Sequence, residues 1–226
     1  KLSGEALMGN HESGIDFHIL AKLADQIITL RKSGFEIAVV LGAGNIWRYR
    51  DNQGSHIDRV YSDYMGMLAT IMNSVALMSA IENRGGYVRV CSALDIPSVA
   101  EPYIKRRATR HLEKGRIVIC AGGTGNPYFT TDTAAALRAL ELECDILLKA
   151  SNIDGVYSDD PKKNKNAKRF SSISYDQVLE KDLKVMDGAA IALCRDKKLP
   201  IQVFEYGKKG DLLKAVKGKV GTRIRE

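Results

Sequence analysis

The sequence predicts an α/β fold in three layers, with a mainly parallel central sheet covered by helices on both faces. Strand-like apolar runs alternate with helical patterns along the chain, which is typical of a parallel sheet. Glycine-rich turns follow several of these runs, and ligands bind at such turns beyond the carboxyl ends of parallel strands. With 226 residues and 45% hydrophobic content, the chain can bury a full core as a single domain over residues 1–226. We expect an N-terminal lobe at about 1–145 and a C-terminal lobe at about 146–226.

Five apolar runs bounded by turn residues predict the strands of this sheet. They lie at about 36–41, 87–91, 116–121, 145–149 and 201–204. The run at 116–121 is apolar almost throughout, so we expect a strand that is buried on both faces.

Two long helical patterns and several shorter ones separate the strands. Asp16 is placed to cap the first helix, which Gly34 ends. The second runs from about Asp58 to Asn83, and Gly66 interrupts its pattern. It carries an apolar stripe, which core packing and a subunit interface explain equally well: Met65, Leu68, Ala69, Met72, Val75 and Ala76. Shorter helices are expected near 98–113, 131–143, 175–180, 187–197 and 209–217.

Composition argues against several classes of protein. No apolar run approaches the roughly 20 residues that a membrane span requires, and no secretory signal opens the chain. The four cysteines are widely spaced without a Cys-x-x-Cys pair, so we expect reduced core residues of a cytoplasmic protein. Because the chain begins with Lys1 rather than methionine, we expect a native segment to precede it.

The formal net charge of +7 is compatible with an anionic ligand or with nucleic acid. Basic residues cluster at 105–107, 162–163, 165–169 and the C-terminal tail, without the aromatic residues of a single-strand-binding surface. We therefore expect a solvated basic surface that binds no nucleic acid. The polar stretch from Ser158 to Ser172 is expected to be a mobile loop between the lobes.

A glycine-rich turn at residues 122–134 directly follows the predicted buried strand. Its glycines precede a row of hydroxyls and Asp132, and Thr130, Thr131 or Asp132 can cap the next helix. Free backbone N–H groups at such a helix start attract phosphate. A plain strand-to-helix connection explains the same residues, so this segment alone leaves both interpretations open.

Three more segments place glycine and polar groups at the ends of strands or presumed strands, namely 1–4, 42–48 and 149–157. Four such segments at one edge of a sheet would form an amide-rich cleft flanked by lysines, which suits a polyphosphate. The common signatures are missing, including a Walker A motif, a Gly-x-Gly-x-x-Gly turn, the protein-kinase motifs and a Gly-x-Ser-x-Gly elbow. The four histidines lie in polar or helical contexts. Lysine, arginine, aspartate and backbone amides remain, and phosphoryl transfer requires little else.

Each candidate side chain also has an ordinary explanation. Lys1, Lys149 and Arg48 suit phosphate oxygens, but cations at strand ends also occur in plain solvent. Asp187 opens a helix and could serve only as its N-cap. Asp63 could lie on a solvated helix face.

Taken in order, these segments resemble the bacterial UMP kinases of the amino acid kinase superfamily over essentially the whole chain. The matching segments are Lys1–Leu7, Gly44–Asn45 with Arg48, Asp63–Asn73, Gly123–Asp132, Asp154–Pro161 and Leu183–Asp187. The string Asp63–Asn73 separates this family from its carbamate-, aspartate- and acetylglutamate-kinase relatives. The resemblance implies the amino acid kinase fold and transfer of the γ-phosphoryl group of ATP to UMP with Mg²⁺, in pyrimidine nucleotide biosynthesis.

The resemblance also implies roles for single residues. Lys1 would bridge the transferring phosphoryl group, and Asp132 and Asp187 would orient Lys1, Lys149 or Mg²⁺, with no direct protein ligand assigned to the metal. The residues that would bind ATP are Lys1, Leu2, Ser3, Gly4, Gly44 and Arg48 at the phosphates, and Ser151, Tyr157 and Asp160 at the nucleoside. The residues that would bind UMP in the N-terminal lobe are Ala43, Asp63, Thr124, Gly125, Asn126, Pro127, Tyr128, Phe129, Thr130 and Thr131. ATP would bind in the C-terminal lobe.

The chain departs from the family pattern at several positions. Ala43 stands where glycine is usual, Ser151 replaces threonine, and Tyr49 follows Arg48 where glycine is common. Members of the family are typically homohexamers, many with GTP activation and UTP inhibition. Arg89 and Arg116 fit the pattern of the GTP site, but Met78 and Glu82 replace basic or polar contacts found in some relatives.

Two alternatives stay open. One is a kinase of the same superfamily for another small acid, carbamate or aspartate. The other is a non-catalytic nucleotide sensor or nucleic-acid binder that uses the basic surface.

Overall fold

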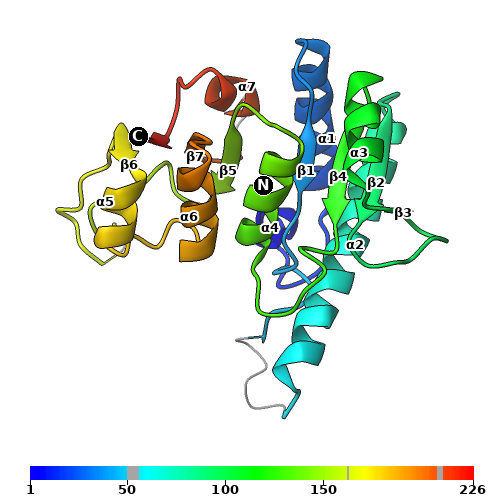
Figure 1. Cartoon of the computed structure of the whole chain (residues 1–226), viewed down its shortest axis with the longest axis horizontal. Helices are drawn as coiled ribbons and strands as arrows, with labels where there is room; N and C mark the ends of the chain where they lie inside the picture. The colour runs from blue at the N-terminus through cyan, green and yellow to red at the C-terminus, as the bar shows by residue number, and fades with distance from the viewer. Residues whose placement is uncertain (50–55, 162, 208–210) are drawn as a thin grey trace. The chain divides into compact units, whose positions relative to one another are not determined.

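The computed structural model describes residues 1–49, 56–161, 163–207 and 211–226 (Figure 1). The chain divides into two compact units, which are described separately. The N-terminal unit is Leu2–Thr131, and the C-terminal unit is Lys1 together with Asp132–Glu226. This division falls earlier in the chain than the lobe boundary expected near residue 145.

The N-terminal unit contains a four-stranded sheet in the order β1-β4-β2-β3, with every pair parallel. Its strands are β1 (Ala38–Val40), β2 (Val88–Ser92), β3 (Glu101–Pro102) and β4 (Ile117–Ala121). All five residues of β4 are buried, as the continuous apolar run predicts. The sequence did not indicate β3, which is only two residues long.

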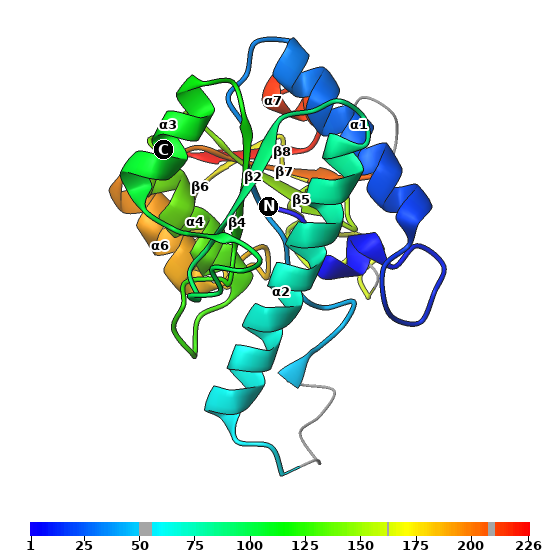
Figure 2. The same cartoon turned by 90° about the vertical axis from the view of Figure 1, so that its right-hand side faces the viewer.

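Helices α1 (Phe17–Lys32) and α2 (Arg59–Glu82) lie on one side of β2 and β4, and α3 (Lys105–Glu113) lies on the other (Figure 2). A short 3-10 helix, η1 (Gly4–Leu7), precedes α1. The Asp16 carboxylate caps α1 by accepting hydrogen bonds from the backbone N–H groups of His18 and Ile19, as predicted. The helix expected from residue 98 begins only at Lys105, because Pro102 belongs to β3 and the residue before a proline disfavours helical backbone.

Helix α2 runs unbroken through Gly66, so the expected interruption is wrong. The helix is long and apolar enough to cross a membrane, with a mean hydropathy of 1.5 over an 18-residue window, contrary to the expectation from sequence. Half of that window is buried inside the protein, so packing accounts for part of its apolar composition. The predicted apolar stripe faces outward in part: Leu68 and Met72 are 47% and 58% exposed, whereas Asn73 and Ser74 are fully buried.

The C-terminal unit holds a second four-stranded sheet in the order β5-β7-β8-β6. Its strands are β5 (Leu147–Ser151), β6 (Ser172–Ser174), β7 (Ile201–Glu205) and β8 (Thr222–Arg225). The β7–β8 pair is antiparallel and the other pairs are parallel. The sequence indicated β5 and β7 but not the short strands β6 and β8.

In the described part of this unit, four helices accompany the sheet: α4 (Thr131–Glu141), α5 (Tyr175–Glu180), α6 (Gly188–Asp196) and α7 (Asp211–Val216). The first residue of α4, Thr131, belongs to the N-terminal unit. Ser174 and Gln177 form a capping box at the start of α5. Residues 209–210 of the helix predicted at 209–217, and Lys162 of the basic clusters, lie outside the described residues.

Candidate active site

One face of α2 carries polar side chains that hold the loops following β1 and β4. Asp63 Oδ2 accepts a hydrogen bond of 2.8 Å from the backbone N–H of Tyr128. Thr70 Oγ1 accepts one of 2.9 Å from the backbone N–H of Gly122, and Asn73 Nδ2 donates one of 2.8 Å to the carbonyl of Gly42. These bonds explain why a helix face that packs against the sheet is polar.

The loop after β1 is fixed from both sides. Arg48 donates from Nε to the carbonyl of Gly44 at 2.6 Å, and its Nη2 lies 3.0 Å from Oε1 of Glu5. Trp47 Nε1 donates to Ser62 Oγ on α2 at 3.0 Å. The contacts with Gly44 and Glu5 therefore hold the Arg48 guanidinium in one orientation beside this loop.

Gly4 allows η1 to approach the loop after β1. A Cβ atom at Gly4 would lie 2.5 Å from both Asn45 Oδ1 and the backbone nitrogen of Gly44. Only glycine fits at this distance, so the predicted glycine-rich segments Leu2–Gly4 and Gly42–Gly44 meet backbone to backbone.

The loop after β4 contains several residues with left-handed backbone. Gly122, Gly123 and Gly125 have positive φ angles, and so does Tyr128, at 70°. A left-handed conformation is costly for an aromatic residue, and it turns the Tyr128 N–H toward Asp63. The conformation of Tyr128 is therefore accompanied by a specific hydrogen-bond partner on α2.

These loops and α2 surround a pocket of about 610 Å³ in the N-terminal unit. Eight of the predicted site residues line it: Ala43, Gly44, Arg48, Asp63, Thr124, Phe129, Thr130 and Thr131. Gly125, Asn126, Pro127 and Tyr128 are not among its lining residues. Gly44 and Arg48, which the resemblance assigns to ATP, thus lie in the same pocket as residues that it assigns to UMP.

Sequence reasoning missed several residues of this pocket, among them Glu5, Trp47 and Arg59. Arg59 is one helical turn before Asp63. Opposite charges at this i, i+4 spacing indicate an ion pair on a helix, so the sequence did contain a signal for Arg59. Glu5 and Trp47 have no such signal, because their partners lie far away in the chain.

In the C-terminal unit, the side chains of Lys1, Asp132 and Lys149 form a compact ionic cluster. Lys1 Nζ lies 2.6 Å from Asp132 Oδ1, and Lys149 Nζ donates to both carboxylate oxygens at 2.6 Å. The three side chains are only 7%, 13% and 11% exposed. Two buried ammonium groups thus share one carboxylate, which leaves an excess of positive charge.

Burial and neighbouring charges set the ionisation of this cluster. Burial and, to a smaller extent, the charge of Lys1 lower the pKa of Lys149 to about 8, although the charge of Asp132 opposes the shift. Burial acts to raise the pKa of Asp132, but the two ammonium groups together hold this pKa below its usual value. Asp132 is therefore charged at neutral pH.

Asp187 contacts Thr133, the residue that follows Asp132 in the sequence. Its Oδ1 caps α6 by accepting a hydrogen bond of 3.0 Å from the Ala190 N–H, and it accepts a second of 2.8 Å from Thr133 Oγ1. The N-cap role considered from the sequence is confirmed, and the contact with Thr133 connects the start of α6 to α4.

The residues assigned to the nucleoside of ATP lie in and after β5. Ser151 ends β5, and its hydroxyl accepts a hydrogen bond of 3.4 Å from the Ile153 N–H. Tyr157 donates from its hydroxyl to Asp154 at 2.7 Å. The carbonyl of Asp160 accepts hydrogen bonds from the N–H groups of Lys163 and Asn164.

Arg89 and Arg116, the two residues assigned to a GTP site, belong to one network in the N-terminal unit. Arg89 Nε lies 3.7 Å from Glu101, and Arg116 Nη1 lies 3.0 Å from Nδ1 of His111. The His111 Nε2 atom is in turn 3.1 Å from Glu101 Oε2. Glu101 therefore acts as an internal counter-ion for this basic cluster.

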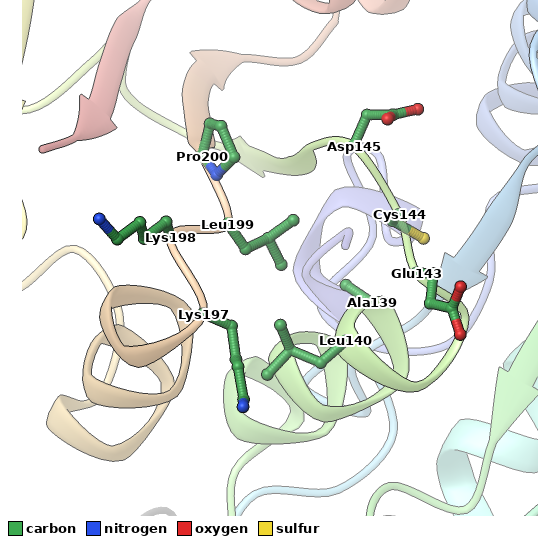
Figure 3. A pocket seen from close by; sticks show the side chains of 9 residues that line it. All are labelled: Ala139, Leu140, Glu143, Cys144, Asp145, Lys197, Lys198, Leu199 and Pro200. Atoms are coloured by element: carbon green, nitrogen blue, oxygen red, sulfur yellow. The ribbon is translucent and has the colours of Figure 1, made fainter.

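A second pocket, of about 420 Å³, lies at the amino ends of β5 and β7 (Figure 3). It is lined by Ala139, Leu140, Glu143, Cys144, Asp145, Lys197, Lys198, Leu199 and Pro200. None of these residues was predicted as a site residue. The charged side chains of Glu143, Lys197 and Lys198 point in different directions, so they do not converge on one ligand position (Figure 3).

Comparison with known proteins adds independent information. A profile of the amino acid kinase family matches residues 1–205. A uridylate kinase of Zymomonas mobilis is 52% identical over 218 residues, which cover 96% of this chain and 90% of that protein.

Two solved structures are also similar. The UMP kinase of Bacillus anthracis superposes with a TM-score of 0.96 at 38% identity, over 99% of this chain and 93% of that one. The UMP kinase of Ureaplasma parvum superposes with a TM-score of 0.94 at 37% identity, over 100% of this chain and 96% of that one. The predicted α/β fold class and the family resemblance are confirmed.

Proposed function

Since the chain belongs to the amino acid kinase family, and within it to the UMP kinases, we propose that it transfers the γ-phosphoryl group of ATP to UMP, giving UDP and ADP. The observation that carries this proposal is the buried cluster in which Lys1 and Lys149 share Asp132. A phosphoryl group in transfer spreads negative charge over its oxygens, and the excess positive charge of the cluster complements it.

Asp132 holds the two ammonium groups in place for this task. A carboxylate 2.6 Å from both nitrogens fixes side chains that would otherwise rotate freely. Lys1 bridges the transferring group and Lys149 neutralises charge beside it, while Asp187 positions the start of α6. Transfer is in line, without a covalent intermediate on the enzyme.

We place UMP in the pocket of the N-terminal unit. Asp63 binds the ribose hydroxyls, and the hydroxyls and amides of residues 124–131 surround the rest of the nucleotide. Arg48 lines this same pocket, so we propose that it faces the phosphate of UMP rather than serving ATP alone.

ATP enters with Mg²⁺, and Ser151, Tyr157 and Asp160 receive its nucleoside. Among the described residues, no group of three or more His, Cys, Asp or Glu side chains is arranged to hold a metal ion. We therefore propose that phosphate oxygens provide most of the ligands to Mg²⁺, with Asp132 and Asp187 nearby to orient it.

We further propose that the protein is a cytoplasmic homohexamer of pyrimidine nucleotide biosynthesis, activated by GTP and inhibited by UTP. An apolar groove of about 890 Å³ between α1 and α2 supports self-association, since its residues Phe17, Leu68 and Met72 are largely exposed. Light scattering coupled to gel filtration measures the number of subunits.

A substrate panel tests the proposed reaction. ADP release is measured with UMP, CMP, carbamate and aspartate as acceptors, and rapid turnover with UMP alone is the expected result. Preference for a small acid would assign the chain to another activity of the superfamily. No turnover with any acceptor, together with salt-sensitive DNA binding, would favour the non-catalytic alternative.

A further inference from the structure

Arg59 has three partners at the mouth of the N-terminal pocket. Its Nε lies 2.9 Å from both carboxylate oxygens of Asp63. The guanidinium also lies 4.5 Å from the centre of the Tyr49 ring and 5.8 Å from that of Tyr128. A planar cation is thus placed against two aromatic rings while it binds a carboxylate.

The three partners come from three separate segments of the unit. Tyr49 belongs to the loop after β1, Asp63 to the first turns of α2, and Tyr128 to the loop after β4. Asp63 also accepts the hydrogen bond from the Tyr128 N–H. The contacts therefore join both ligand-facing loops to α2.

The charge of Arg59 matters for the ligand. Asp63 is only 14% exposed, and a lone carboxylate in this pocket would repel the phosphate of a nucleotide. The Arg59 guanidinium compensates that charge and leaves lone pairs of Asp63 available to accept further hydrogen bonds.

We propose that Tyr49, Arg59 and Tyr128 form a clamp that positions Asp63 and closes the acceptor pocket around the nucleoside monophosphate. Arg59 acts as a positioning residue through Asp63 and does not contact the reacting atoms. This inference rests on the proposed function, because it assigns the acceptor to this pocket.

If the clamp acts as proposed, its loss changes the KM for the acceptor, UMP, and not the KM for ATP. Arg59→Gln removes the charge and raises the KM for UMP by about tenfold or more, because a charge-assisted hydrogen bond is lost. The KM for ATP stays within about twofold. Arg59→Lys keeps the charge but loses the planar contact, so it restores part of the UMP affinity.

Tyr49 provides a second test that does not disturb Asp63 directly. Tyr49→Ala raises the KM for UMP by about two- to fivefold, whereas Tyr49→Phe leaves it unchanged, because the ring and not the hydroxyl contacts Arg59. Arg110→Gln is the matched control, since Arg110 pairs with Glu113 on the exposed surface of α3. Thermal unfolding of each variant shows whether the fold is retained.

The outcomes separate the two proposals. If the wild-type enzyme fails to phosphorylate UMP, the proposed function fails and the clamp with it. If it phosphorylates UMP but folded Arg59→Gln and Tyr49→Ala both keep the wild-type KM for UMP, only the clamp is overturned. Equal increases in the KM for UMP and for ATP would also overturn it, because they would indicate a general structural role.

Discussion

Asn45 and Asn73 exchange a reciprocal pair of hydrogen bonds, 2.9 and 2.8 Å long, in the buried interior of the N-terminal unit. Asn73 also donates to the carbonyl of Gly42, and Asn45 donates to that of Gly14. The pair connects α2 to the loop after β1, and it leaves neither amide unsatisfied. The geometry of the acceptor pocket thus depends on two side chains that do not line it.

Asn73→Ala is expected to lower the free energy of unfolding by about 2–4 kcal/mol, because it leaves buried polar groups of Asn45 and Gly42 without their partner. Chemical denaturation measures the loss. Asn166→Ala, at an exposed loop position, is the control and should change stability by less than about 0.5 kcal/mol. If Asn73→Ala lowered the free energy of unfolding no more than Asn166→Ala does, the amide pair would contribute nothing to stability.

Lys1→Ala should reduce kcat by at least a hundredfold, because it removes one of the two ammonium groups that we propose to stabilise charge in the transition state. The KM for UMP should stay nearly unchanged, since we place UMP in the pocket of the other unit. Steady-state kinetics at saturating ATP make the comparison. Retention of activity within about tenfold, equivalent to about 1.4 kcal/mol of barrier, would remove Lys1 from the catalytic set.

The depressed pKa of Lys149 predicts an alkaline limit for activity. As the pH rises through about 8, this lysine loses its proton in the folded enzyme and the cluster loses its excess positive charge. We expect kcat/KM for ATP to fall above that pH, and the Lys149→Arg variant, which stays charged, to lack the fall even if its activity is lower. Identical pH profiles for the two proteins would show that Lys149 does not control this ionisation.

The free energy of unfolding should rise over the same pH range in which kcat/KM for ATP falls. The pKa of Lys149 is about 8 in the folded protein and near its ordinary value of 10.5 in the unfolded chain, so the unfolded chain binds more protons between these pH values. This lysine therefore makes the free energy of unfolding rise between pH 8 and pH 10.5. Denaturant titrations of wild type and Lys149→Met across this window isolate its contribution.

Glu101 should compete with an anionic effector for the basic cluster around it. If GTP binds Arg89 and Arg116, Glu101→Gln removes the internal counter-ion and should lower the GTP concentration that gives half-maximal activation. Arg116→Ala should abolish activation while leaving basal turnover intact. The GTP dependence of the initial rate measures both effects, and a wild-type enzyme indifferent to GTP would reject the assignment.

The central strands could be predicted because burial on both faces makes their sequences continuously apolar, as in β4 and β7. The strand β8 was not predicted, because its one fully buried aliphatic residue, Ile224, stands between Arg223 and Arg225 and forms no apolar run. Its place in the sheet depends on pairing with β6 and β7, which no local pattern reveals.

The candidate site shows the same division between local and long-range information. Glycine-rich turns and strand-end lysines are local signals, and they indicated both loops of the N-terminal pocket and the candidates Lys1 and Lys149. Only the family resemblance suggested that Asp132 orients these lysines. The partners of α2 could not be predicted in the same way. Thr70 and Asn73 lie on a helix face that a hydrophobic pattern would assign to solvent, yet they are buried because loops distant in sequence satisfy their hydrogen bonds.

Among the described residues of the C-terminal unit, α4, α5 and α6 end in the same motif, with Glu143, Asp182 and Lys198 rather than glycine at its left-handed position. After α6, the Leu199 N–H donates to the Cys194 carbonyl at 2.8 Å and the Lys198 N–H to that of Arg195 at 3.0 Å. Lys198 has a φ of 55°, and Glu143 takes the equivalent position after α4 with the same φ. Helices with this ending usually place glycine there, because side chains are strained in the left-handed region.

Lys198→Gly should therefore stabilise the protein relative to Lys198→Ala by about 1 kcal/mol. The alanine variant is the proper reference, because both changes remove the exposed ion pair of Lys198 with Glu226 and only glycine relieves the strain. At the neighbouring Lys197, where φ is −108°, the same comparison should favour alanine or show no difference. Chemical denaturation of the four variants tests this, and equal stability of glycine and alanine at position 198 would show that the left-handed backbone there carries no strain.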